Sequence, residues 1–345
     1  MAEGPSTVAL VATPPGPCGV AVVQIIGPEA RDVARRAGIR LAPAPAWSRL
    51  DDDVLACARP AASTPWKLPT VEVSCHGGSA APRALVARLG VPVATRTEVY
   101  DDAVRRRVLD RTRAEAWLLL PEARTWRATT MLLAQVRGAL ARAVASLRTR
   151  ADAQRLLKTA RSGRALVDPP TVVLAGRANA GKSTLLNALA GRDRALVSPH
   201  PGTTRDPVAE IVAIDGFPVR LVDTAGFAER AEPLDQEAMR RSREASAKAA
   251  LTLWIRDARE PSQGEGDLRV AAKMDLPDAA AVRGEVSICA LSGEGLARLR
   301  KRILGRLGLE PVRGAAVFTA RQETLLEALA AGARAAEVLG KLLWT

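Results

Sequence analysis

Residues 171–191 read TVVLAGRANAGKSTLLNALAG, and this stretch determines the fold of the central part of the chain. It opens with a β-branched run over 171–174, continues with the pattern GxxxxGKS over 176–183, and ends in a helix-forming segment that stops at Gly191. A strand, a glycine-rich loop and a helix in this order form a phosphate-binding P-loop. The glycines let backbone N–H groups face a phosphate, and the helix N-terminus adds positive potential. A plain glycine-rich turn is the alternative, which the long pattern in its required context disfavours.

The side chains of this loop have separate expected roles. Lys182 is expected to reach the β- and γ-phosphates of a nucleotide, and Ser183 is expected to ligate Mg²⁺. The nucleotide-binding residues predicted in the stretch are Asn179, Ala180, Gly181, Lys182, Ser183 and Thr184.

Downstream residues indicate the class of nucleotide-binding domain. Thr204, in VSPHPGTTRDP, offers a hydroxyl that completes Mg²⁺ coordination when a γ-phosphate is present. A hairpin turning at Asp215-Gly216 would bring Asp223 to the metal side of the site and the Gly226 N–H to the γ-phosphate. A loop threonine followed by DxxG after a hairpin is the switch arrangement typical of GTPases, and it is rare in P-loop ATPases. The nucleotide-binding residues predicted here are Thr203, Thr204, Asp223, Thr224, Ala225 and Gly226.

The tetrad Ala272-Lys273-Met274-Asp275 stands where a guanine-reading GTPase carries Asn-Lys-any-Asp. Asp275 is expected to accept both hydrogen bonds from the N1 and N2 edge of guanine, with the stem of Lys273 along the base. Ala272 lacks the amide that would tie this loop to its neighbours. We therefore expect the free energy of GTP binding to be weaker by about 1–3 kcal/mol, which lowers the affinity roughly tenfold to hundredfold. The tetrad therefore predicts a GTPase with weakened nucleotide binding and not an ATPase.

Composition and charge limit the remaining classes of function. The chain has 345 residues, four scattered cysteines without a CxxC pair, and two histidines, which exclude a His-rich metal site. It has no apolar run long enough to span a membrane and no secretion signal at its start, so we expect a cytoplasmic protein. The net charge of +13 favours an anionic partner such as RNA, and an arginine-rich composition typical of a GC-rich genome explains it equally well.

The pattern along the chain changes from region to region. Short β-like runs with proline-rich breaks extend from Thr7 to about Thr97, and arginine- and alanine-rich sequence of helical spacing follows to Ala165. After the breaker DPP, βα alternation continues to about Leu307. The tail, ARQETLLEALAAGARAAEVLGKLLWT, is predicted to form one amphipathic helix.

With these motifs, the chain resembles the MnmE/TrmE family of tRNA modification GTPases. TVALVATPPGPCGVAVVQIIGPEA at 7–30 and VEVSCHGG at 71–78 resemble the family's N-terminal motifs, and FTARQETLLEAL at 318–329 resembles the segment that re-enters its helical domain. GRANAGKSTLLNAL, VSPHPGTTRD, DTAG and ALSGEG occur between them in the family's order. The motifs of the GTPase domain alone fit many GTPases, and the N-terminal pair singles out this family.

The resemblance implies a multi-domain α/β fold in which a Ras-like P-loop GTPase domain is inserted in a helical domain and preceded by a small α+β dimerisation domain. The predicted domains are a folate-binding and dimerisation type domain at 1–97, the first part of the helical domain at 98–168, the GTPase domain at 169–310, and a C-terminal remnant of the helical domain at 311–345. Compared with the family, the chain lacks most of the C-terminal helical half and the terminal Cys-Ile-Gly-Lys.

The family's catalytic residues carry over by position. Asp235 aligns with the glutamate that orients the attacking water, so the predicted catalytic residues are Asp235 and Lys182. Because aspartate is one methylene shorter, we expect hydrolysis to be slow or absent. The family's potassium-site positions are occupied by Asn179, Ser198, His200 and Thr203, where a K⁺ would neutralise charge developing between the phosphates. The second base-reading loop carries Cys289 and Ala290.

Glu72 matches the glutamate of the family's folate site, which implies a tetrahydrofolate derivative as a further ligand. Gln24 and Val108 stand where the family has an accompanying arginine and lysine, so this site departs from the family pattern. The resemblance also implies a homodimer formed through the N-terminal domain, and the MnmG (GidA) flavoprotein and tRNA as partners.

Three hypotheses about function remain open. The first is a K⁺-stimulated GTPase that acts in modification of the wobble uridine (U34) of tRNA. The second is a degenerate homologue that binds guanine nucleotide as a regulatory or scaffold module, which Gln24 and Val108 favour. The third is an RNA- or ribosome-associated GTPase that uses the basic surface.

Overall fold

The structure is a computed structural model, and it describes residues 6–13, 18–41, 46–49, 53–177, 179–191, 209–223, 249–261 and 265–345. The chain divides into two compact units. The first contains the described residues of 1–118 and 339–345, and the second contains those of 119–198 and 205–338. No helix in these described ranges is long and apolar enough to cross a membrane.

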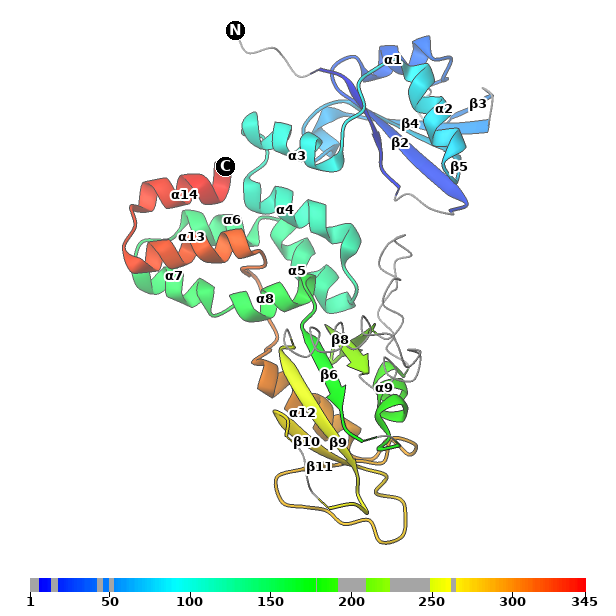
Figure 1. The fold of residues 1–345 in the computed structure, drawn as a ribbon. Coiled ribbons are helices and arrows are strands. Elements are labelled where there is room, and N and C mark those ends of the chain that lie inside the picture. The colour runs from blue at the N-terminus through cyan, green and yellow to red at the C-terminus, as the bar shows by residue number, and fades with distance from the viewer. Residues whose placement is uncertain are drawn as a thin grey trace, which may run out of the picture. The chain divides into compact units, whose positions relative to one another are not determined.

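The first unit contains a five-stranded antiparallel sheet in the order β1-β2-β5-β4-β3 (Figure 1). Helices α1 and α2 pack on this sheet, mainly against β2 and β5. The predicted β-like runs in this region are confirmed at β1, β2 and β5. The elements are β1 (Val8–Val11), β2 (Val20–Ile26), α1 (Ala30–Arg36), β3 (Ala46–Arg49), β4 (Asp53–Arg59), β5 (Thr70–His76) and α2 (Ala80–Leu89).

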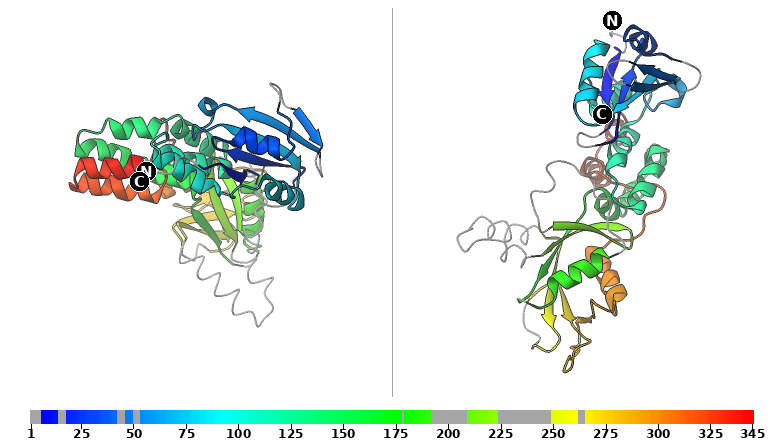
Figure 2. Two further views of the ribbon diagram at one scale, coloured as in Figure 1. Left: turned by 90° about the horizontal axis from the view of Figure 1, so that it is seen from above. Right: turned by 90° about the vertical axis from the view of Figure 1, so that its right-hand side faces the viewer.

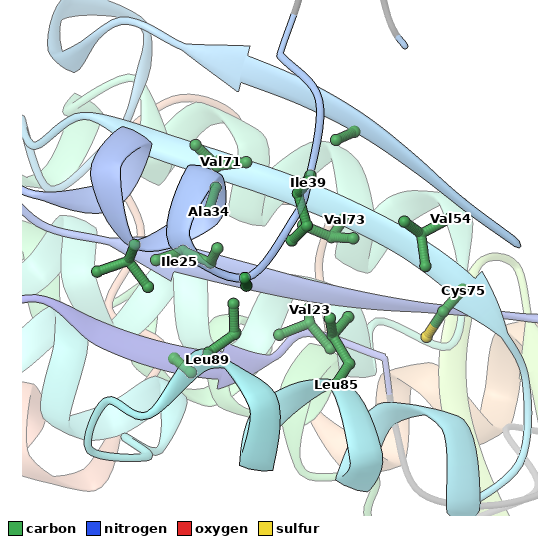
Figure 3. Close-up of a cluster of buried hydrophobic side chains, with 14 of the residues drawn as sticks. Val23, Ile25, Ala34, Ile39, Val54, Val71, Val73, Cys75, Leu85 and Leu89 are labelled. Atoms are coloured by element: carbon green, nitrogen blue, oxygen red, sulfur yellow. The ribbon is translucent and has the colours of Figure 1, made fainter. Parts of the chain in front are cut away.

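The core of this unit follows from the alternation of side chains along its strands. Val23 and Ile25 of β2 and Val73 of β5 are buried and lie on the side of α2, where they meet Leu85 and Leu89 (Figure 3). Because successive residues of a strand point to opposite faces, the intervening polar residues of β2 and β5 lie on the other face of the sheet.

The helical region predicted between residues 98 and 165 is confirmed. Three of its helices, α3, α5 and α7, begin after a capping threonine: the hydroxyls of Thr95, Thr125 and Thr149 each accept a hydrogen bond from the backbone N–H of the third helical residue. The helices are α3 (Arg96–Arg105), α4 (Arg111–Leu119), α5 (Trp126–Val136), α6 (Ala139–Ala145), α7 (Arg150–Leu157) and α8 (Ala160–Val167), with short 3-10 helices at Ala61–Ser63 and Leu120–Glu122.

The second unit contains a six-stranded mixed sheet in the order β11-β10-β9-β6-β8-β7, in which only β7 runs antiparallel to its neighbour. The parallel strands end at a common edge, where loops of α/β folds bind their ligands. The strands are β6 (Thr171–Ala175), β7 (Ala209–Ile214), β8 (Phe217–Asp223), β9 (Leu251–Asp257), β10 (Leu268–Ala272) and β11 (Val286–Ser287), and the helices beside them are α9 (Lys182–Ala190) and α12 (Leu296–Leu307).

The hairpin predicted at Asp215-Gly216 is confirmed. These two residues connect β7 to β8 and have φ angles of 47° and 82°. Two positive φ angles in a two-residue loop give a turn whose twist matches that of the strands. The returning strand pairs with β6 so that Asp223 lies opposite Leu174, beside the start of the P-loop.

The C-terminal tail forms two helices, so the predicted single helix is wrong. α13 (Ala320–Ala331) ends at Gly332, whose φ is 109°, and α14 (Ala335–Trp344) follows. The N–H of Gly332 donates to the carbonyl of Leu329 and closes the end of α13. The apolar spacing continues across the glycine, which is why the pattern alone indicated one helix.

α13 packs along α7, although the six-stranded sheet lies between them in the sequence (Figures 1 and 2). Arg164 of α8 donates to Glu323 of α13 over 2.6 Å, and the side-chain amide of Gln135 in α5 donates to the Gly314 carbonyl over 2.8 Å. Helices from before and after the sheet therefore form one cluster within the second unit.

Candidate nucleotide-binding site

The P-loop backbone follows β6 as a narrow turn. Gly176 has φ 147°, and a Cβ built there would lie 2.0 Å from the Ile255 carbonyl oxygen, so no larger residue fits. Gly181 has φ 97° and caps the N-terminus of α9, and Asn179 before it has φ 60°. Such a loop leading into a helix N-terminus is where proteins bind phosphate groups.

Lys182, the first residue of α9, is held against the loop that precedes it. The residue is 4% exposed, and its Nζ donates to the carbonyls of Gly176 at 3.0 Å and Arg177 at 2.6 Å. Of its neighbours in the predicted stretch, Ala180 is buried and Thr184 is exposed. The lysine ammonium therefore lies at the P-loop backbone, and its contact with phosphate stays a prediction.

Ser183 and Asp223 meet across the site. The Ser183 hydroxyl, in the first turn of α9, donates to Oδ2 of Asp223 at the end of β8 over 2.7 Å. Hydroxyl and carboxylate oxygens are the hard donors that Mg²⁺ prefers, and substrate phosphates commonly complete its coordination. No three His, Cys, Asp or Glu side chains cluster in the described ranges. The pair therefore fits a Mg²⁺ ion whose remaining ligands would come from the phosphates of a nucleotide.

The predicted base-reading loop, residues 272–275, is tied to the P-loop by a lysine. Lys273 follows β10 with φ 63°, and its Nζ donates to the Asn179 carbonyl over 2.6 Å. Ala272 is 2% exposed, and its Cβ lies 3.6 Å from where a Cβ on Gly181 would be. The side chain at position 272 thus faces the P-loop. An asparagine at this position, as in the usual guanine-reading tetrad, would direct its amide toward that loop. A methyl group packs in its place, and Lys273 makes the polar link.

Asp257, at the end of β9, anchors the same lysine and was not predicted. Its Oδ2 lies 3.1 Å from Lys273 Nζ, and its two oxygens accept bonds of 3.0 and 2.7 Å from Nε and Nη2 of Arg259. The Arg259 hydrogen bond, joined by the Lys273 ammonium, holds the pKa of the Asp257 carboxyl well below its usual range. The sequence signal was an acidic residue at the end of a mostly apolar strand, at the edge of the sheet where the loops of the site begin.

The loop that carries Cys289 and Ala290 lies beside the loop after β10. The Met274 N–H donates to the Ile288 carbonyl over 3.2 Å and joins the two loops. Cys289 is buried and Ala290 is half-buried, whereas Asp275 is exposed. Asp275 is thus an exposed residue of the same loop as the anchored Lys273.

In the first unit, both carboxylate oxygens of Glu72 have protein partners. The Gln24 amide donates to Oε1 over 2.9 Å, and Arg59 Nε donates to Oε2 over 2.6 Å. The hydrogen bond to Glu72 raises the pKa of Arg59, which the sequence analysis did not single out. Val108 packs against a separate apolar cluster that contains Tyr100. Val108, which stands where the family has a lysine, thus lies in an apolar environment.

Several predicted site residues lie outside the described ranges. They are Ser198, His200, Thr203, Thr204, Thr224, Ala225, Gly226 and Asp235. The water-orienting aspartate, most of the switch residues and most of the potassium site therefore stay predictions.

Known proteins are similar to this chain in sequence. Residues 171–278 match the family described as 50S ribosome-binding GTPase. The tRNA modification GTPase MnmE of Xanthomonas campestris pv. campestris (strain B100) is 33% identical over 385 aligned residues, which cover 93% of this chain and 86% of that protein. The chain belongs to the MnmE family. As a member of the MnmE family it is a GTP hydrolase with a P-loop GTPase domain.

Further MnmE relatives and one solved structure add to the comparison. The MnmE protein of Methylobacterium sp. (strain 4-46) is 47% identical over 184 residues, which cover 51% of this chain and 41% of that protein. The G domain of the T. maritima FeoB iron transporter aligns at 22% identity with a TM-score of 0.29, covering 40% of this chain and 98% of that domain.

Proposed function

We propose that this MnmE-family chain hydrolyses GTP in a K⁺-stimulated reaction coupled to modification of the wobble uridine (U34) of tRNA, with the MnmG (GidA) flavoprotein as partner. Family membership supports the reaction class. The observation that carries the hydrolase role is the 2.7 Å contact between Ser183 and Asp223 next to the P-loop lysine, Lys182.

Three side chains would act on the phosphates. Lys182 would exchange its two loop carbonyls for β- and γ-phosphate oxygens and neutralise part of their charge. Ser183 and Asp223 would hold Mg²⁺, which supplies further charge neutralisation at these phosphates when it is bound. The P-loop N–H groups at the start of α9 would orient the same oxygens.

The base-reading loop would select guanine. Asp275 is exposed, and a carboxylate accepts hydrogen bonds from the N1 and N2 groups of guanine but meets a lone pair at N1 of adenine. Lys273, held by Asn179 and Asp257, would lie along the base. These contacts support GTP over ATP even though Ala272 supplies no amide.

The resemblance supports a K⁺ bound by Asn179, Ser198, His200 and Thr203, and Asp235 as the residue that orients water. The test is GTP turnover by the purified chain in KCl and in NaCl. We expect a higher rate in KCl, and a further rise in the Asp235→Glu variant, whose carboxylate reaches one methylene farther. Equal rates in the two salts would remove the potassium assignment.

The domain arrangement is part of the proposal. The packing of α13 along α7 supports a GTPase domain inserted in a helical domain. A homodimer formed through the N-terminal domain is supported by the resemblance of residues 1–97. Light scattering of the full chain should give the mass of a dimer, and a monomer mass would contradict this part.

A second function is favoured by the pairing of Glu72 with Gln24 and Arg59. Each Glu72 oxygen already accepts a bond from a protein side chain, so fewer of its acceptor positions are open to a folate ring, which favours a guanine-nucleotide-binding scaffold without one-carbon chemistry. The net charge of +13 supports the alternative of a GTPase that associates with RNA or the ribosome.

Two measurements separate these functions. The first is wobble-uridine modification in a strain that lacks its own MnmE and expresses this chain, read by mass spectrometry of tRNA nucleosides. The second is titration of the purified chain with a tetrahydrofolate derivative. Restored modification supports the first function. No restoration and no folate binding, with GTP turnover intact, supports the scaffold.

A further inference from the structure

A buried arginine contacts the loop after β10, which contains the predicted base-reading residues. Arg256 belongs to β9 and Glu285 precedes β11, and their side chains are 4% and 1% exposed. Nη2 of Arg256 lies 2.8 Å from Oε2 of Glu285, and Nε donates to the same oxygen over 2.9 Å. Charged side chains are almost never buried this deeply unless they are paired.

The guanidinium also binds the backbone of two loops. Nη1 donates to the carbonyls of Asp257 at 3.1 Å and Glu260 at 2.7 Å, and Nη2 donates to the Ala280 carbonyl at 3.0 Å. Together with the contacts to Glu285, every N–H of Arg256 faces an acceptor. One side chain thus joins the loop after β9 to the loop after β10.

These contacts enclose the segment that carries the base-reading residues. The segment starts at Ala272, which pairs with Asp257 in the sheet, and Arg256 holds it again at Ala280. Lys273 and Asp275 lie between these two fixed points. A backbone bond from the Ala280 N–H to the Ala258 carbonyl, 3.0 Å long, reinforces the far end.

Stability alone does not account for this arrangement. Removing two charges from water is costly, and a well-packed apolar pair of similar volume often gives equal or greater stability than a buried ion pair. An apolar residue, however, leaves the carbonyls of Asp257, Glu260 and Ala280 without their donor. What the arginine adds is a fixed backbone geometry around the base-reading loop.

We propose that Arg256, oriented by Glu285, is a positioning residue for base recognition, and that it fixes Lys273 and Asp275 in a loop where Ala272 offers no side-chain amide. The proposal rests on the proposed guanine contact of Asp275. Arg256 itself does not touch the nucleotide and acts through the backbone of the loop.

The experiment compares the affinities of the full chain for GTP and ITP in the presence of Mg²⁺. ITP lacks the exocyclic amino group that one oxygen of Asp275 would accept from, so the ratio of the two affinities reports how well the carboxylate is placed. The variants are Arg256→Lys, which keeps the charge and loses the planar fork, and the double variant Arg256→Met/Glu285→Leu, which replaces the pair with apolar groups. Ile303→Ala, in the buried face of α12, is the matched control for general destabilisation.

We expect the GTP-over-ITP preference to fall by about tenfold in both Arg256 variants, the loss that follows when one hydrogen bond to a charged group is no longer aligned. The preference should stay at the wild-type value in Ile303→Ala, although its melting temperature falls. The double variant leaves three backbone carbonyls without their donor, so its melting temperature should also fall. Because Ile303→Ala loses melting temperature without losing the preference, destabilisation alone does not explain the lower preference of the double variant.

Two results would overturn the inference, and they are distinguishable. If Asp275→Ala lowers the preference but neither Arg256 variant does, Arg256 is structural only and the guanine contact stands. If Asp275→Ala leaves the preference unchanged, the proposed guanine contact is wrong, and the positioning role is lost with it.

Discussion

Replacing Lys273 with methionine tests the link that takes the place of the missing amide. The change removes the 2.6 Å bond from Lys273 Nζ to the Asn179 carbonyl and the 3.1 Å contact with Asp257, and it keeps most of the side-chain volume. Hydrogen bonds to charged groups contribute about 1.5–3 kcal/mol, and the 31% exposure of the Lys273 side chain places this one near the lower limit. We therefore expect roughly a tenfold loss of GDP and GTP affinity.

The fold should tolerate this change. Arg259 still contacts both oxygens of Asp257, so the carboxylate stays paired and its pKa stays depressed. A carboxyl with a depressed folded-state pKa stabilises the fold above its unfolded-state pKa and loses this contribution only as the pH falls toward the folded value. Near neutral pH the melting temperature of Lys273→Met should therefore stay close to that of the wild type.

The assay is a fluorescence titration with a labelled guanine nucleotide, run beside thermal melting. Lys301→Met, which removes an exposed lysine from α12, is the matched control and should bind like the wild type. Wild-type affinity in Lys273→Met would refute the link to the P-loop. A loss of affinity that follows a loss of melting temperature would show that Lys273 supports the fold and not the nucleotide.

Three further predictions test other parts of the site and the first unit. Gly176→Ala should abolish nucleotide binding, because its Cβ would lie 2.0 Å from the Ile255 carbonyl, and wild-type binding in a titration would contradict the narrow turn. Ser183→Ala removes the hydroxyl that meets Asp223, so Mg²⁺-dependent GTP turnover should fall at least about tenfold, as is typical when groups around a metal are lost. Tyr100 is the chain's single tyrosine, and burial raises its pKa from 10.0 to about 12, so ultraviolet titration of the phenol should give a midpoint near that value. Because the folded-state pKa is raised, the contribution of Tyr100 to the free energy of unfolding is complete below pH 10.0 and is lost as the pH rises toward about 12. Tyr100→Phe should remove this pH dependence of stability.

The features that were predicted correctly from the sequence are mostly local. The strand, glycine loop and helix around Gly181 are specified by adjacent residues, and so is the Asp215-Gly216 turn, whose positive φ angles suit these two residue types. The motif order predicted Ser183 and Asp223 on the metal side of one site; the structure brings the two together, and their binding of Mg²⁺ stays a prediction. Each of these predictions needed only a short segment or an established spacing.

The features that were missed depend on pairing between distant segments. Lys273 reaches Asn179 because the ends of β6 and β10 lie at one edge of the sheet, which no short segment specifies. Arg256 appears in the sequence as a polar residue near the end of a mostly apolar strand, and its partner Glu285 lies in a polar loop with no pattern of its own. The tail shows the opposite error, because apolar spacing continues through Gly332 where the backbone turns out of the helix.

The most direct test of the central claim is the affinity of the purified full chain for GTP and for ATP with Mg²⁺, followed by turnover of each. The account predicts that Asp275 and the anchored Lys273 suffice for base choice, so GTP should bind at least about a hundredfold more tightly than ATP and should be the nucleotide that is hydrolysed. Equal affinity for the two nucleotides would contradict it and would mean that this base-reading loop does not recognise guanine.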